Sequence, residues 1–240
     1  MLISKKTSAL LQNKLENSSE LFCSGLFLSA RWAILSQVAQ KVLHLIVLPT
    51  KESAEYCSAD LYNLVEGDCV FFLPESGKSV ERSNYKSSLG VQRTAAIGKI
   101  LSYSDEKLFI VTYPEALEEK VPAPEKLSDA LLVIKEGQEI KYDTIRQRLM
   151  DEGFEKVDFV SAPGQFALRG AVIDIFSFSS EKPFRLSFFG NEVEKIHLFD
   201  CNTQLSLEKV EKADIYPDIA AREPGEGQSL TSLLSADTTV

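Results

Sequence analysis

Residues 163–200 read PGQFALRGAVIDIFSFSSEKPFRLSFFGNEVEKIHLFD, and this stretch decides the fold of the second half of the chain. It contains three strand-like runs, VIDIF, FRLSFF and VEKIHLF, which are separated by turn residues and show no helical period. Short apolar runs bounded by Gly, Pro, Asn and Ser are typical of strands joined by tight turns. The stretch therefore predicts a small antiparallel sheet.

The run FRLSFF, residues 184–189, places its side chains on two faces, because successive residues of a strand point in opposite directions. One face is wholly apolar and is expected in the core; it comprises Phe184, Leu186 and Phe188. The other face pairs Arg185 with Phe189, and arginine with aromatics is the usual composition of a protein–protein hot spot. Gly190 and Asn191 fit a two-residue hairpin turn that leaves Phe189 within reach of a partner. The alternative is that Phe189 caps a minor core under a helix.

Three strings of this half, ALRGAVIDIF, PFRLSFFGNEVEKIHLFD and TQLSLEKVEKADIYP, are similar to the second domain of the bacterial transcription-repair coupling factors (Mfd). The excision-nuclease subunit UvrB contains the same module. The resemblance spans residues 133–217 and extends more loosely over the preceding hundred or so residues. In both families this domain docks the damage sensor UvrA. Carried over position by position, the resemblance implies partner-binding roles for Arg169, Arg185 and Phe189.

The composition limits the class of protein. The 240 residues are 44% apolar, enough for one large domain or two ordinary ones. Acidic residues outnumber basic ones by 35 to 26, and a formal charge of −9 argues against a chain that grips a phosphate backbone by itself. No apolar run reaches the roughly 18 residues of a membrane helix, and no cleavable signal is evident, so we expect a cytoplasmic protein.

Cysteine and histidine spacing predicts no metal site. The four cysteines form no C-x-x-C pair: Cys23, Cys57, Cys69 and Cys201. The two histidines, His44 and His197, are far apart in the sequence. Most of the cysteines lie in apolar runs, as small core residues do in a reducing compartment. We therefore expect neither a metal nor a disulfide framework.

The first half alternates apolar runs with helical patterns. Strands are expected near residues 21–26, 44–49, 69–74 and 107–114, with helices between them and a short helix opened by Pro114. Parallel strands need helical crossovers, so this half is expected to be α/β with a parallel sheet.

A nucleotide-binding loop would stand after the first of these strands. Compared with G-x-x-x-x-G-K-[ST], residues 25–32 keep Gly25 but place Ala30, Arg31 and Trp32 at the Gly, Lys and Ser/Thr positions. No strand ends in an acidic pair that could hold a metal ion. We interpret this half as a degenerate helicase-like (RecA-like) domain without a cofactor. In this respect the chain resembles the coupling factors, whose UvrB-like module has no working nucleotide-binding loop, whereas UvrB keeps one.

A helix introduces the small sheet. Tyr142, Ile145 and Leu149 form one helical stripe, Gly153 is a stop signal, and a strand is expected at residues 157–160. The helix is expected to pack on the apolar face of FRLSFF and to leave the arginine face free. Asp174, with no second carboxylate nearby in sequence, is interpreted as a structural or rim charge rather than a catalytic acid.

These observations predict an α/β fold with three segments: a degenerate P-loop-like α/β domain (1–136), an inserted α+β docking domain built on an antiparallel sheet (137–217), and a linker that begins a further segment (218–240). The resemblance implies a non-catalytic adaptor that recruits UvrA to stalled RNA polymerase, as the N-terminal part of a longer ATP-driven translocase on double-stranded DNA. Two alternatives remain. One is part of UvrB or another nucleotide-hydrolysing enzyme, and the other is a structural domain that clamps a motor elsewhere.

Overall fold

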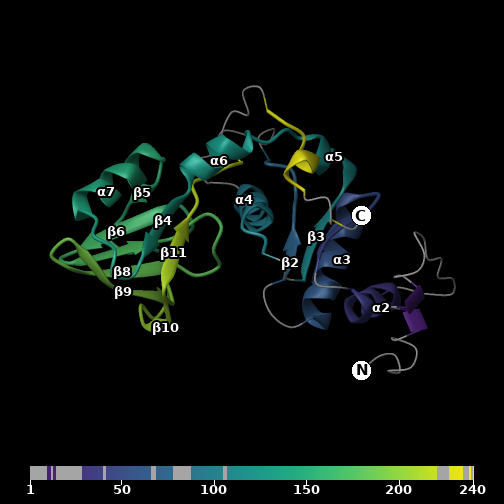
Figure 1. Cartoon of the computed structure of the whole chain (residues 1–240), viewed down its shortest axis with the longest axis horizontal. Helices are drawn as coiled ribbons and strands as arrows, with labels where there is room; N and C mark the ends of the chain where they lie inside the picture. The colour runs from purple at the N-terminus through teal and green to yellow at the C-terminus, as the bar shows by residue number, and fades with distance from the viewer. Residues whose placement is uncertain are drawn as a thin grey trace. The chain divides into compact units, whose positions relative to one another are not determined.

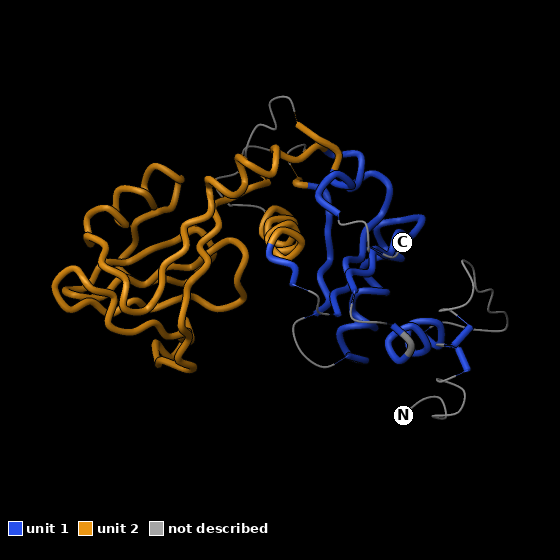
Figure 2. The backbone as a smooth tube through the Cα atoms, viewed as in Figure 1, with its two compact units in different colours: residues 1–75, 102–119, 230–240 blue, residues 76–101, 120–229 orange. Residues whose placement is uncertain are grey.

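The computed structural model of the chain describes residues 10–11, 13–14, 29–39, 42–65, 69–77, 88–104, 107–220, 227–234, 238 and 240. Two compact units form: unit 1 from residues 1–75, 102–119 and 230–240, and unit 2 from residues 76–101 and 120–229 (Figure 2). The domain limits expected at residues 136 and 217 both lie inside unit 2, and that division stays a prediction. Within the described ranges, no helix combines the length and apolar character that crossing a membrane requires.

Unit 1 contains a three-stranded parallel sheet in the order β1-β3-β2. Figure 1 labels two of its strands, β2 and β3. Its strands are β1 (Leu43–Val47), β2 (Val70–Phe72) and β3 (Leu108–Thr112). Its helices are α2 (Ala30–Val38), α3 (Lys51–Leu64) and α5 (Pro114–Glu118), with a short 3-10 helix η1 (Leu230–Leu233). Every residue of the central strand β3 is buried, as its uninterrupted apolar run requires. The α/β class and the parallel sheet are therefore confirmed, while the strand expected at 21–26 lies outside the described residues.

Helix α3 shows how local sequence sets an element of unit 1. Thr50 and Ser53 form a reciprocal capping box at its N-terminus, which satisfies backbone N–H groups that the helix leaves unpaired. Ala54, Cys57 and Leu61 recur at helical spacing and are buried, so they form the face of the helix that packs into the core.

Unit 2 is built on a six-stranded sheet in the order β10-β9-β8-β7-β6-β5. Its strands are β5 (Glu155–Lys156), β6 (Gln165–Arg169), β7 (Val172–Ile175), β8 (Phe184–Phe189), β9 (Glu192–Phe199) and β10 (Ser206–Val210). All neighbours are antiparallel except β5 and β6. A second, two-stranded sheet pairs β4 (Leu132–Lys135) with β11 (Lys212–Ile215), and the helices are α4 (Ser88–Leu101), α6 (Pro124–Ala130) and α7 (Tyr142–Asp151). The predicted antiparallel sheet is confirmed.

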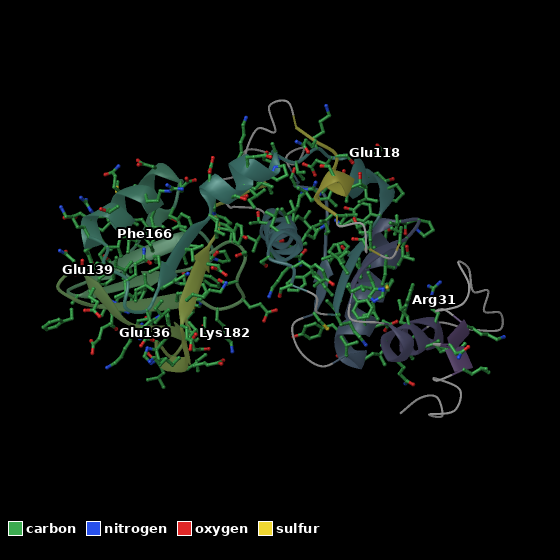
Figure 3. All side chains as sticks on the ribbon, in the orientation of Figure 1. Arg31, Glu118, Glu136, Glu139, Phe166 and Lys182 are labelled. Carbon is green, nitrogen blue, oxygen red and sulfur yellow. The ribbon has the colours of Figure 1, made fainter. Side chains whose placement is uncertain are left out.

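One face of the six-stranded sheet packs against α7. Ile145 and Leu149 of the helix join a buried cluster with the apolar face of β8 and with Phe166, which Figure 3 labels in the interior of the unit. Tyr142 meets the ring of Phe188 edge to face, with centroids 5.6 Å apart. The expected packing of the helix is confirmed.

The prediction of a strand at residues 157–160 is wrong. The strand is β5, two residues earlier, which follows Gly153 in the left-handed conformation (φ +79°). Residues 157–164 form a loop instead, because Val157 and Val160 turn into a small separate core and the Gln165 side chain accepts the N–H groups of Ser161 and Ala162.

Candidate docking face of the antiparallel sheet

The outer face of the six-stranded sheet lies opposite α7. Alternate residues of strands β6 to β9 define it: Ala167, Arg169, Val172, Asp174, Arg185, Ser187, Phe189 and His197. Burial in β8 follows the strand period: the three apolar residues of the inner face are buried, Arg185 and Ser187 are half-buried, and Phe189 is exposed. The predicted division of this run into two faces is confirmed.

Arg185 lies in the middle of the outer face and is bound on several sides. Its Nε donates to Asp174 Oδ1 at 2.7 Å and its Nη2 to Asp174 Oδ2 at 3.0 Å, a bidentate ion pair. Its Nη1 donates to the carbonyl of Gln204 at 2.9 Å, and its guanidinium carbon lies 4.3 Å from the centroid of the Phe199 ring. Only 16% of the side chain is exposed. Arg185 is therefore held within its own unit far more tightly than the free side chain that strand alternation predicted.

Asp174 is the centre of this arrangement. Its side chain is 1% exposed, and it is paired across the sheet with Ala167 on one side and Arg185 on the other. Arg169 Nη2 also donates to its Oδ2, so two guanidinium groups share one carboxylate. This confirms the interpretation of Asp174 as a structural charge. The three groups together carry one net positive charge.

Arg169, at the end of β6, is the more accessible of the two arginines. Its side chain is 36% exposed. Besides Asp174 it contacts Phe159, with its guanidinium carbon 5.5 Å from the ring centroid, a distance within the range of cation–π attraction. Arg169 is therefore oriented by a buried carboxylate and an exposed ring.

The turn after β9 positions the carbonyl that Arg185 binds. Asp200 Oδ1 accepts the backbone N–H groups of Asn202 at 3.0 Å and Thr203 at 2.7 Å, and the Thr203 hydroxyl at 3.0 Å. These hydrogen bonds, chiefly those from Thr203, lower the pKa of the Asp200 carboxyl. Gln204 follows in the left-handed conformation (φ +60°), which sequence reasoning did not identify. Its carbonyl is thereby available to Arg185.

Phe189 lies at the hairpin end of β8 with 79% of its surface exposed. It pairs with Glu192 across the turn, in which Gly190 has φ +62° and Asn191 has no positive φ. This combination is the two-residue turn with Gly first that the sequence predicted. The alternative in which Phe189 caps a minor core is wrong, since other residues fill that core: Val160, Ala167, Phe176 and Phe199.

Phe159 is the residue of this face that sequence reasoning missed. It lies in the β5–β6 loop and is 62% exposed, although it stands between a strand and the buried Val160. The run VDFV resembles a strand, so an alternation argument assigns its faces incorrectly. Its membership of this face depends on the contact of its ring with Arg169, ten positions away in the sequence.

The structure describes only part of the segment compared with a nucleotide-binding loop, residues 25–32. Gly25 and the three residues after it lie outside the described ranges. Trp32 is 9% exposed and belongs to the core of unit 1, with the Arg31 guanidinium carbon 4.4 Å from its ring centroid. Over the described residues, no group of three His, Cys, Asp or Glu side chains is arranged to hold a metal ion.

Part of unit 2 is similar to a known family of domains. Residues 132–220 match the family model of the UvrB interaction domain. The match covers the two-stranded sheet, α7 and the whole six-stranded sheet.

The chain is similar to three proteins named transcription-repair-coupling factor. The protein of Bacillus subtilis is 31% identical over 205 residues, which is 84% of this chain and 17% of the relative. The protein of Escherichia coli is 41% identical over 86 residues (36% and 8%), and that of Haemophilus influenzae is 28% identical over 175 residues (73% and 15%). The chain thus spans less than a fifth of the length of these relatives.

Proposed function

Because this chain is related over most of its length to the N-terminal UvrB-like module of the transcription-repair-coupling factors, we propose that its unit 2 docks UvrA. In this role the chain is an adaptor without chemistry of its own. It brings the damage sensor of nucleotide excision repair to stalled RNA polymerase. The family match supports a protein-interaction role for unit 2, and the outer face is the surface we assign to it.

The exposure of Phe189 is the observation that supports this assignment best. Burying a phenylalanine contributes about 1.5–3 kcal/mol, and a ring that is 79% exposed contributes little of this to folding. The contribution remains available for association with a partner. The ring also stands on a hydrogen-bonded hairpin, so little backbone entropy is lost when a partner covers it.

We assign different roles to the three predicted docking residues. Phe189 is the apolar anchor, and Arg169 is the accessible cation that meets acidic or carbonyl groups of the partner. Arg185 presents only a small part of its surface, so its contribution is a smaller direct contact together with the positioning of Asp174.

Titration of the chain with purified UvrA tests this proposal. Phe189→Ala is expected to weaken binding about 30-fold, the effect of a hot-spot residue, and Arg169→Ala about tenfold. Phe189→Ala should unfold at the wild-type temperature, because its ring is largely exposed. Arg169→Ala should unfold at a slightly lower temperature, because it removes an ion pair with the buried Asp174 carboxylate. Met150→Ala is the matched control: Met150 is 49% exposed and lies on α7, on the other side of the sheet, so its loss should leave binding unchanged. If Phe189→Ala binds like the wild type, this docking face is incorrect.

The wider proposal concerns the longer protein. By analogy with the family, that protein is a cytoplasmic, ATP-driven translocase that binds double-stranded DNA and RNA polymerase, and unit 1 is a helicase-like fold that has lost its nucleotide chemistry. Measurable ATP turnover or tight nucleotide binding by this chain would contradict that reading and favour a UvrB-like enzyme. The structural-clamp alternative predicts instead that Phe189→Ala lowers stability and leaves UvrA binding intact.

A further inference from the structure

Phe159 is exposed although the loop around it is anchored in the protein. Val157 and Val160 pack on the minor core of the outer face, and the Ser161 and Ala162 N–H groups are bound by Gln165 at 3.0 Å each. The backbone that presents Phe159 is therefore fixed on both sides. A single exposed apolar side chain is ordinary, so exposure alone assigns it no role.

The contact with Arg169 is the second observation. The guanidinium of Arg169 lies against the Phe159 ring on one side and binds the buried Asp174 carboxylate on the other. Holding a long side chain between two fixed groups reduces the entropy lost when it binds. The exposed ring and the partly exposed cation lie in contact, and Asp174 neutralises only one of the two arginines that it binds.

The patch is continuous with the face assigned to docking. Arg169 pairs with Val172 on β7, and Val172 pairs with Ser187, two residues before Phe189 on β8. Two strand spacings separate β6 from β8, about 10 Å. Rings from two separate elements, the β5–β6 loop and β8, thus stand on the same face as the accessible Arg169, and clustered aromatics with arginine are the composition of binding hot spots.

We propose that Phe159 is a second aromatic anchor of the docking face, and that with Arg169 it receives an acidic side chain of the partner together with an adjacent apolar one. This inference rests on the proposed function and extends the surface beyond the three residues named above. The occupant is UvrA, and the Arg169 guanidinium beside the Phe159 ring favours a carboxylate of UvrA next to an apolar side chain.

Binding of purified UvrA to variants of this chain tests the proposal. Phe159→Ala should weaken binding about tenfold and Phe159→Tyr should restore it, because the tyrosine ring keeps the contact with Arg169. Phe159→Leu keeps an apolar side chain without the ring and should restore binding only in part. Tyr56→Ala is the matched control, since Tyr56 is 76% exposed on α3 of unit 1 and should leave affinity unchanged. All variants should unfold at the wild-type temperature, because the replaced rings are exposed.

The outcomes separate the two proposals. A loss beyond about twofold for Phe159→Ala, outside the usual scatter of surface substitutions, supports the second anchor. Affinity within about twofold of wild type, while Phe189→Ala weakens binding, overturns the second anchor and leaves the proposed function intact. If the wild-type chain itself does not bind UvrA, both proposals fail.

Discussion

Replacing Asp174 with asparagine should destabilise unit 2 more than removing either arginine that it binds. The carboxylate is 1% exposed and accepts hydrogen bonds from both Arg185 and Arg169. Breaking a buried ion pair by removing one partner costs about 3–5 kcal/mol, because the other charge stays buried without compensation. Arg185 keeps the Gln204 carbonyl and the Phe199 ring, which reduces the penalty. We expect Asp174→Asn to lower the free energy of unfolding by about 2–3 kcal/mol.

Methionine in place of each arginine provides the comparison, because it keeps most of the aliphatic packing. Arg185→Met should cost about 1–2 kcal/mol, since Asp174 then still has Arg169 as a counter-ion. Arg169→Met should cost less than about 1 kcal/mol, because its side chain is 36% exposed and its ion pair is partly screened by water. The expected order of destabilisation is therefore Asp174, then Arg185, then Arg169.

Urea unfolding followed by far-ultraviolet circular dichroism measures these differences. The single tryptophan, Trp32, belongs to unit 1, so its fluorescence gives a separate transition that identifies any effect on that unit. Hydrogen exchange of the β7 and β8 amides should accelerate in the Asp174 variant, because these strands carry the ion pair. Stability within about 0.5 kcal/mol of wild type, or a smaller loss than for Arg169→Met, would refute the reasoning.

Two further predictions concern a turn and a thiol. Gly190→Ala should destabilise unit 2 by about 1 kcal/mol in urea unfolding, because φ is +62° there, although a Cβ would meet no atom within 4 Å. Gly90→Ala is the control, because Gly90 has an ordinary helical φ in α4, and this change should be neutral or stabilising. A greater loss of stability for Gly90→Ala than for Gly190→Ala would contradict the conformational explanation. Burial raises the pKa of Cys57 to about 12, so almost none of this thiol is ionised at pH 8. Ellman's reagent should therefore label Cys57 more slowly than the half-buried Cys201. Peptide mapping that finds Cys57 labelled first would show that α3 opens readily.

The sequence by itself determined the two faces of β8, the helix that packs on one of them and the hairpin that follows the strand. A period of two placed Phe184, Leu186 and Phe188 in the core, and a period near 3.6 placed Ile145 and Leu149 against them. Gly190 identified the hairpin because its turn requires a positive φ that glycine adopts without strain. These signals are local, since each depends on residues within one or two turns or strands.

The tertiary structure alone decided which charges of the outer face are paired and which rings stay exposed. Arg185 was expected to be free, but register places it beside Asp174, 11 residues earlier, and the turn after β9 brings the Gln204 carbonyl to it from 19 residues later. The exposure of Phe159 likewise depends on how the β5–β6 loop packs. Neither follows from side-chain periodicity, because periodicity gives the direction in which a side chain points and not which strand lies beside it. A charge is free or bound according to its neighbour across the sheet, and that neighbour is fixed only when the strands pair.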